Sequence, residues 1–188
     1  MPDPTPGSAA TRAALLTAAR ALFAHAGYDA VGVREVAARA GVTAALVNRY
    51  FGSKLGLFEA AVADSFTVSD LLVGDRATLG ERLARYLVGR RRGAAGGTAA
   101  EPTLVVLRSA SSPEAGPVLR AALDAQVVRP LAAWLGGPDA DARAGLVVAA
   151  LFGVAVSRDV LGVDALGPDR ADALAAALGP FLQRLVDG

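Results

Sequence analysis

The sequence predicts an all-α protein of about nine helices, with an N-terminal three-helix domain and a C-terminal helical bundle. Three observations support this: alternating strand patterns are nearly absent, alanine and apolar residues recur at helical spacing, and glycine or proline separates the periodic segments. The chain has 188 residues, 53% of them hydrophobic, which is enough for a substantial core. We expect residues 1–10 to be a flexible arm, residues 11–54 the small domain and residues 55–188 the bundle.

The first helix of the small domain carries one apolar stripe, at i, i+4, i+7, i+8 and i+11, and Gly27 marks its end. Gly41 separates the next two helices, and Ser53 is placed to act as the N-cap of a fourth. The stripe comprises Leu15, Ala19, Leu22, Phe23 and Ala26. The expected helices span residues 11–26, 33–40, 43–51 and 54–72.

Glycine, proline and capping residues also divide the C-terminal bundle into helices. A loop is expected at the Gly- and Ala-rich stretch 93–100, Asp139 can cap one helix, and Pro168 suits the first turn of the last. The expected helices span residues 75–92, 103–110, 116–135, 139–161 and 168–186.

The last two expected helices have large apolar surfaces. The stretch Ala144–Val156 is apolar all round, so most of its faces must be buried, and the final helix has one apolar side. Two readings stay open: an ordinary core, or pairing with the same two helices of a second subunit. The uncharged run of thirteen residues is short of the roughly 20 that cross a bilayer, so no membrane partner is expected. The apolar side of the last helix comprises Leu174, Leu178, Phe181, Leu182 and Leu185.

The composition argues against an enzyme. There is no cysteine, which excludes disulfides and thiolate metal sites, and the single histidine, His25, leaves almost nothing for zinc binding or Ser-His catalysis. The pairs Ser111-Ser112 and Asp139/Asp141 are interpreted as turn and cap residues. We therefore expect no catalytic residue, metal or cofactor. The first residues lack the features of a signal peptide, and we expect a cytoplasmic protein.

Charge is distributed unevenly along the chain. Residues 1–55 hold six Lys or Arg and three Asp or Glu, which gives +3, whereas residues 56–188 hold thirteen and fifteen, which gives −2. A basic N-terminal part fits an anionic partner there, although solvated helix faces also scatter charge in this way.

Residues 33–51 have the spacing of a helix-turn-helix. Ala37, Gly41 and Val47 supply a small contact residue, a flexible turn and an apolar filler for two steeply crossing helices. At 100° per residue, Leu46 and Val47, with much of Tyr50, share one side of the second helix. Ala44, Ala45, Asn48 and Arg49 share the other side. A tight helical hairpin within an ordinary bundle would show the same spacing.

The exposed side of this helix has the chemistry of a DNA-reading surface. Small side chains at Ala44 and Ala45 allow close approach to bases, and Asn48 can form two hydrogen bonds with adenine. Phosphates can be held by Arg49, Tyr50, Lys54 and the N-terminus of the next helix.

Residues Thr11–Val62 resemble the N-terminal DNA-binding domain of the TetR family of bacterial transcriptional regulators. The segments ALFAHAGY, VREVAARAGV and YFGSK occur in the family's order and register. The resemblance implies that Arg34 reaches a guanine, that Ala44, Ala45 and Asn48 contact bases, and that Thr43, Tyr50 and Lys54 hold phosphates. The family usually has Thr or Ser where Val31-Gly32 stand, a hydroxyl at Leu46 and Tyr at Asn48, so one phosphate contact and the base preference are not transferable.

The resemblance also implies functions for the C-terminal bundle, namely dimerisation and ligand binding. It implies a homodimer through the last two helices, a palindromic operator in double-stranded DNA, and a small-molecule ligand whose binding releases a repressor. Core packing is the alternative reading for each candidate ligand-binding residue. The alternative function is a helical small-molecule binding protein with weak or no DNA binding. The candidate ligand-binding residues are Phe66, Leu104, Leu107, Arg108, Trp134 and Phe152.

Overall fold

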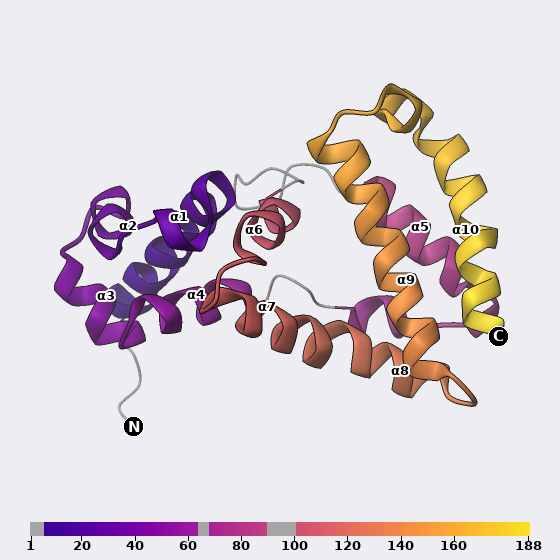
Figure 1. The fold of residues 1–188 in the computed structure, drawn as a ribbon, viewed down its shortest axis with the longest axis horizontal. Helices are drawn as coiled ribbons and strands as arrows, with labels where there is room; N and C mark the ends of the chain where they lie inside the picture. The colour runs from indigo at the N-terminus through magenta and orange to yellow at the C-terminus, as the bar shows by residue number, and fades with distance from the viewer. Residues whose placement is uncertain (1–5, 64–67, 90–100) are drawn as a thin grey trace. The chain divides into compact units, whose positions relative to one another are not determined.

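The computed structural model describes residues 6–63, 68–89 and 101–188, and every regular element within them is helical. The chain forms two compact units, whose helices are labelled in Figure 1. The middle of the chain belongs with the N-terminal helices, so no single cut of the sequence separates the units. The first unit comprises Met1–Ser65 with Leu104–Ala121, and the second comprises Phe66–Thr103 with Ala122–Gly188.

The first unit is built on a long opening helix. It begins at Pro6, five residues before the predicted start, so residues 6–10 are helical rather than an arm. Its regular part ends at Gly27, as predicted, where φ is 78°. The helices are α1 (Pro6–Ala30), α2 (Val33–Arg39), α3 (Ala44–Phe51) and α4 (Lys54–Val62), with most of α6 (Glu101–Ser109) and α7 (Ala115–Leu123).

An aromatic cluster forms the core of the first unit. The rings of Phe23 and Phe58 lie 5.0 Å apart edge to face, and Tyr28 lies 5.2 Å from Phe58. All three side chains are buried, together with Leu15 and Leu57. Because Phe23 and Tyr28 come from α1 and Phe58 from α4, the cluster fixes α4 against α1 and sets the frame on which α2 and α3 are mounted.

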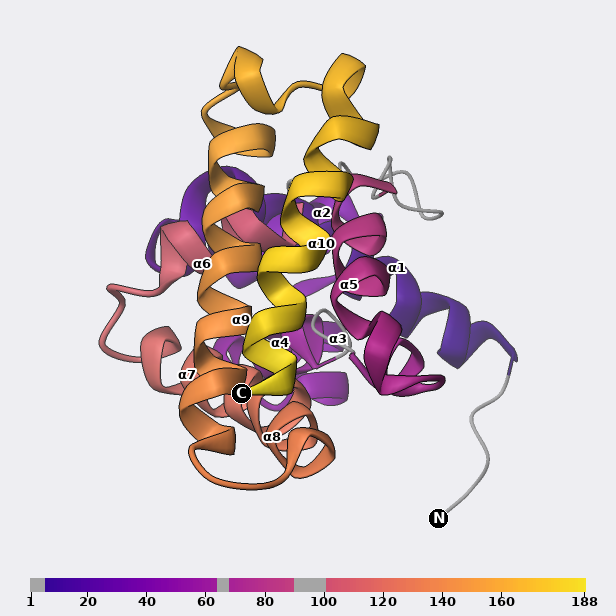
Figure 2. The same ribbon diagram turned by 90° about the vertical axis from the view of Figure 1, so that its right-hand side faces the viewer.

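The second unit is an all-helical bundle joined by short 3-10 and π turns, which are labelled η. Helices α7 and α8 follow each other along the chain through η3 and are counted as one, so the described residues hold nine helices, in agreement with the prediction. In Figure 2, α9 and α10 run side by side with α5 next to α10. The elements are η1 (Ser69–Leu72), η2 (Arg76–Thr78), α5 (Leu79–Gly89), η3 (Asp124–Val128), α8 (Arg129–Leu135), α9 (Ala140–Ala155), η4 (Val156–Val160), η5 (Asp164–Leu166), η6 (Pro168–Arg170) and α10 (Ala171–Asp187).

Helices α5 and α10 meet backbone to backbone. A Cβ on Gly80 would overlap the carbonyl oxygen of Gly179 and lie 2.6 Å from the amide nitrogen of Gln183. The Gly80 amide donates to Gln183 Oε1 at 2.9 Å. Leu83 and Leu182 are fully buried in the adjoining core. The close approach therefore depends on glycine having no side chain.

Arginine side chains tie the helix ends of this unit together. Arg76 donates to the carbonyls of Leu135 and Val186, at 2.7 and 2.6 Å, near the ends of α8 and α10. Arg158 donates to two carbonyls in the last turn of α5, at 2.9 and 3.0 Å. The last carbonyls of a helix have no partner within it, so a guanidinium that bridges two of them satisfies groups that would otherwise need water.

Several local predictions are resolved by the structure. Ser53 caps α4, since its Oγ accepts the Gly56 amide at 3.0 Å, and Pro168 opens the turn before α10. Asp139 was expected to cap α9, but its side chain forms no cap bond because the residue adopts a left-handed backbone with φ 55°. The predicted loop at 93–100 lies outside the described residues.

Helix α9 is longer than its uncharged run. Together with η4 it spans Ala140–Val160, 21 residues with a mean hydropathy of 1.6 over the most apolar 18-residue window. The predicted helix, residues 139–161, agrees with this span, and it includes charged residues at both ends of the thirteen-residue uncharged run. By length and composition alone, this one helix among the described residues could cross a membrane, which is weak evidence, because the core helices of soluble proteins have the same properties.

Candidate nucleic-acid interface

The second helix of the helix-turn-helix, α3, has one buried side and one exposed side. Val47 is fully buried, and Leu46 is half-buried. On the opposite side Ala45, Asn48 and Arg49 are exposed, and the neighbouring Ala44 is half-buried. The observed division agrees with the one derived from the helical period.

The turn before α3 has the geometry that the spacing predicted. Gly41 has φ 70°, a conformation that favours glycine. The Val42 amide donates to the Ala37 carbonyl at 2.9 Å, and the Gly41 amide to that of Ala38 at 3.1 Å. Ala37 is buried, which lets α2 and α3 pack closely. Arg34, on the first turn of α2, is exposed.

The starts of α2 and α3 have no side-chain cap. Gly32 occupies the N-cap of α2 and has no side-chain hydroxyl. The Thr or Ser that the family resemblance leads one to expect there, as cap and phosphate ligand, is therefore missing. Thr43 occupies the N-cap of α3, where its exposed side chain forms no cap bond. The Thr43 hydroxyl is therefore not committed to capping α3.

Tyr50 is a predicted contact residue whose polar group is engaged within its own unit. Its hydroxyl donates to Ser8 Oγ at 3.2 Å, which ties the end of α3 to the first turns of α1. A phosphate contact by this phenol would require that bond to be exchanged. Arg49, beside it, remains exposed.

Lys54, the first residue of α4, is held at its exposed end by the end of α1. Its Nζ donates to the carbonyl of Asp29 at 3.4 Å and lies 4.2 Å from the centre of the Tyr28 ring. Tyr28 is buried, and its hydroxyl donates to Glu114 Oε2 at 2.6 Å. Burial and this carboxylate together raise the pKa of the Tyr28 phenol well above its usual value.

The candidate ligand-binding residues are divided between the two units. Leu104, Leu107 and Arg108 belong to the first unit, and the Arg108 guanidinium donates to the carbonyls of Ala24 and His25 in α1. Trp134 and Phe152 belong to the second unit and are half-buried there. Phe66 lies outside the described residues.

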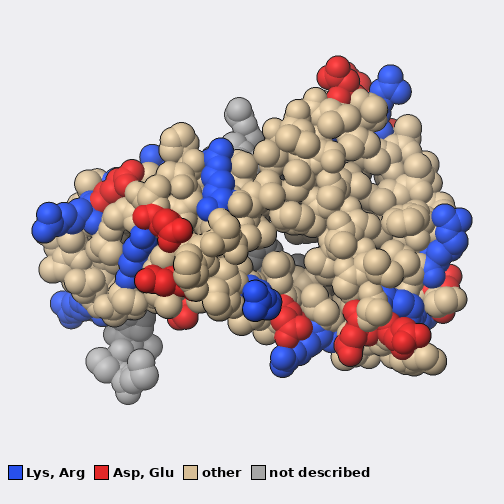
Figure 3. Space-filling view, viewed as in Figure 1, with Lys and Arg blue, Asp and Glu red and all other residues tan. Residues whose placement is uncertain are grey.

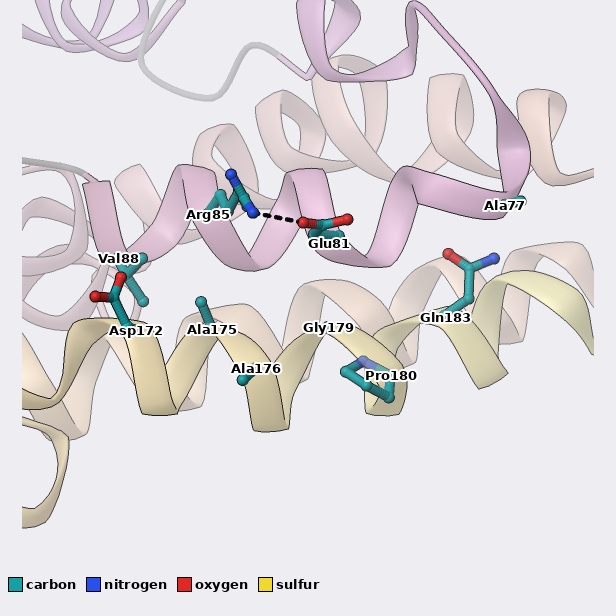
Figure 4. A pocket seen from close by; sticks show the side chains of 10 residues that line it. All are labelled: Ala77, Glu81, Arg85, Val88, Asp172, Ala175, Ala176, Gly179, Pro180 and Gln183. Carbon is teal, nitrogen blue, oxygen red and sulfur yellow. Dashed lines mark ion pairs between the residues drawn. The ribbon is translucent and has the colours of Figure 1, made fainter.

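The second unit has a groove that the sequence did not indicate. It lies along α5 and α10, has a volume of about 790 Å³, and an ion pair between Glu81 and Arg85 (2.7 Å) runs along one wall (Figure 4). Asp172 and Gln183 add polar atoms from α10. None of the candidate ligand-binding residues that the structure describes lines it. Among the described residues no group of three or more His, Asp or Glu could hold a metal ion.

Two protein-family models match the chain. Residues 15–61 match the model described as "Bacterial regulatory proteins, tetR family", and residues 77–186 match the one described as "Tetracyclin repressor-like, C-terminal domain". No functionally curated protein matches the sequence.

Solved structures with the same fold include several regulators. A TetR-family regulator from Streptomyces coelicolor A3 is 29% identical, with 100% of both chains covered and a TM-score of 0.64. NalD, the secondary repressor of the MexAB-OprM multidrug efflux pump in Pseudomonas aeruginosa, is 19% identical over 89% of this chain and 94% of its own, with a TM-score of 0.64. A protein from Saccharomonospora viridis in complex with choline is 21% identical over 92% of this chain and 95% of its own, with a TM-score of 0.61.

Proposed function

The chain belongs to the TetR family of bacterial transcriptional regulators, and we propose that it is a homodimeric repressor that a small molecule releases from a palindromic operator. Its family makes it a DNA-binding regulator and not an enzyme. Release by a ligand is supported by the family's typical behaviour and by the choline bound to the S. viridis protein. A repressor acts on DNA in the cytoplasm, which is where we place it.

The observation that carries the DNA-reading proposal is the exposed flank of α3. Ala45 and Asn48 are exposed while Val47 anchors the opposite side in the core, so this flank is free to enter a major groove. We assign base contacts to Arg34, Ala44, Ala45 and Asn48, and phosphate contacts to Thr43, Arg49, Tyr50 and Lys54.

The dimer proposal is supported by the outward face of α9. Ala142, Leu146, Ala149 and Gly153 recur at helical spacing, and all four are exposed. Most of the surface over α9 carries no charge (Figure 3), and only 17% of its most apolar window is buried within the chain. On α10, beside it, Phe181 is 43% exposed. Apolar faces this large on adjacent helices are covered most simply by the same pair of helices from a second subunit.

A second copy fits this face better than lipid does. Arg143 and Arg158, near the two ends of α9 and η4, donate to carbonyls of α10 and α5, at 2.9 Å to Val186 and to Leu87. The helix is thus bonded on one side to its own unit, and its other side, which carries Leu146, is apolar and exposed. A two-fold pair of chains presents two α3 helices, which matches two half-sites of a palindrome.

DNA selection tests the proposed function. Wild-type protein incubated with random duplexes should enrich a palindrome, and Asn48→Ala should relax preference at one base pair per half-site, at a cost of about 1–3 kcal/mol. Lys54→Ala should weaken binding to all duplexes alike and flatten the salt slope by about 0.9 per lost phosphate contact. Failure of the wild-type protein to bind any duplex at low salt would favour the small-molecule binding protein instead.

Ligand release is tested on the selected operator. Small molecules that bind the second unit should lower operator affinity by about 5- to 150-fold, the usual range of allosteric coupling. By linkage, operator DNA should weaken binding of the same molecule by the same factor. A molecule that binds without changing operator affinity in either direction would contradict its role as inducer.

A further inference from the structure

The turn between α6 and α7 is bonded to the end of α1 by three side chains. Ser109 Oγ accepts the Tyr28 amide at 3.0 Å, Ser112 Oγ donates to Asp29 Oδ1 at 2.8 Å, and Glu114 Oε2 accepts the Tyr28 hydroxyl at 2.6 Å. Ser109 and Ser112 are buried, which shields the bond from the Tyr28 amide to Ser109 from water, whereas Asp29 and Glu114 are exposed. We call this turn the α6–α7 corner.

The backbone of α6 also lies directly against α1. A Cβ on Gly27 would overlap the carbonyl oxygen of Arg108. The Arg108 guanidinium in turn donates to the carbonyls of Ala24 and His25, in the last regular turn of α1. Backbone contact on one side and guanidinium bonds on the other leave the α6–α7 corner little freedom relative to Tyr28 and Asp29.

Tyr28 and Asp29 are also the two residues that hold Lys54. The ammonium lies over the Tyr28 ring and donates to the Asp29 carbonyl. Among the described residues no ion pair involves Lys54. Its charge is thus steadied by a π face and a neutral carbonyl but not cancelled by a carboxylate, and two of its three N–H donors remain for a phosphate.

We propose that Tyr28 and Asp29 are positioning residues for the phosphate contact of Lys54, and that the α6–α7 corner fixes them through Glu114 and Ser112. The proposal rests on the assignment of Lys54 to phosphate in the proposed function. A free lysine side chain has high rotamer entropy. A lysine whose ammonium is already held in place therefore loses less conformational entropy when it binds a phosphate. The α6–α7 corner therefore contributes to DNA affinity without touching DNA.

The test is a double-mutant cycle on a random-sequence 30-base-pair duplex, which reports phosphate contacts alone. Glu114→Ala should weaken binding by about fivefold per subunit, a factor typical of losing one prearranged side chain. In a Lys54→Ala background the same change should have no effect. Glu114→Gln keeps an acceptor for the Tyr28 hydroxyl and should restore binding, and Ser111→Ala, on the same turn, is the matched control.

Three results would overturn the proposal: no loss with Glu114→Ala, an equal loss in both backgrounds, or no restoration by Gln. If Glu114→Ala fails to fold, Tyr28→Phe replaces it, because it keeps the ring over Lys54 and removes only the bond to Glu114. The salt dependence of DNA affinity distinguishes the two explanations. Loss of positioning should flatten its slope, whereas plain destabilisation of the fold leaves the slope measured for the folded fraction unchanged. If Lys54→Ala itself changes neither affinity nor slope, the assignment of Lys54 in the proposed function fails instead.

Discussion

Truncation of Leu146 gives the sharpest test of how two copies of this chain pair. Leu146 projects from α9 and is 55% exposed in the single chain. Leu→Ala removes three carbons, worth about 2.4 kcal/mol if all were newly buried at about 0.8 kcal/mol each. Scaled by the exposed 55%, about 1.3 kcal/mol is available to a partner subunit. A two-fold interface contains the change twice, so dimerisation should weaken by about 2.6 kcal/mol, or about 80-fold in Kd.

Sedimentation across nanomolar to micromolar concentrations measures that dissociation constant. Val73→Ala is the matched control, because Val73 is 76% exposed in the same unit but lies on neither α9 nor α10. Its dissociation constant should equal that of the wild type. The Leu146→Ala dimer should also lose affinity for a palindromic duplex while keeping its affinity for a half-site. An unchanged dissociation constant for Leu146→Ala, or a wild-type chain that stays single at micromolar concentration, would refute the assignment of α9 to the dimer interface.

Three further changes test contacts within the units, one in the second unit and two in the first. Gly80→Ala should destabilise the second unit by about 1–3 kcal/mol in urea denaturation, since the new Cβ meets backbone that cannot rotate away, whereas Gly89→Ala, with nothing within 4 Å, should not. Ser53→Ala should cost about 0.5–2 kcal/mol by removing the α4 cap, and equal stability would argue against the cap. Because the pKa of Tyr28 is raised on folding, its contribution is complete below pH 10 and declines above it, by at most about 1.4 kcal/mol per pH unit. Tyr28→Phe should lack this part of the alkaline loss of stability.

The helix-turn-helix was predictable from sequence because its determinants are local. Gly41 ends one helix, Val47 and its neighbours repeat at the helical period, and Ser53 caps the next helix, all within a few residues of the structure they specify. The same pattern separated the exposed side chain of Asn48 from the buried one of Val47. The flank of α3 therefore follows from a period and a turn, without knowledge of any distant contact.

Long-range partners could not be predicted in this way. The sequence predicts Gly27 as the end of a helix. Its second role, the close approach to the backbone of Arg108, depends on a residue far away in the sequence. Nothing near Glu114 in sequence indicates that it accepts a bond from Tyr28. Tyr50, expected at a phosphate, is bonded to Ser8 because α1 begins earlier than its apolar stripe suggests.

The chain's basic residues show why composition is a poor guide to a DNA-binding surface. Arginine outnumbers lysine 18 to 1, yet four arginines each donate to two backbone carbonyls near helix ends, inside their own units. A guanidinium suits that task because its planar fork offers several fixed donors, which an ammonium lacks. The only lysine, Lys54, lies instead at the start of α4, where a compact charge with freely rotating donors can meet a phosphate. Arginine thus stabilises helix ends in this chain, whereas the lysine is placed to bind phosphate. The four bridging arginines are Arg76, Arg108, Arg143 and Arg158, and replacing any of them by lysine should destabilise the fold.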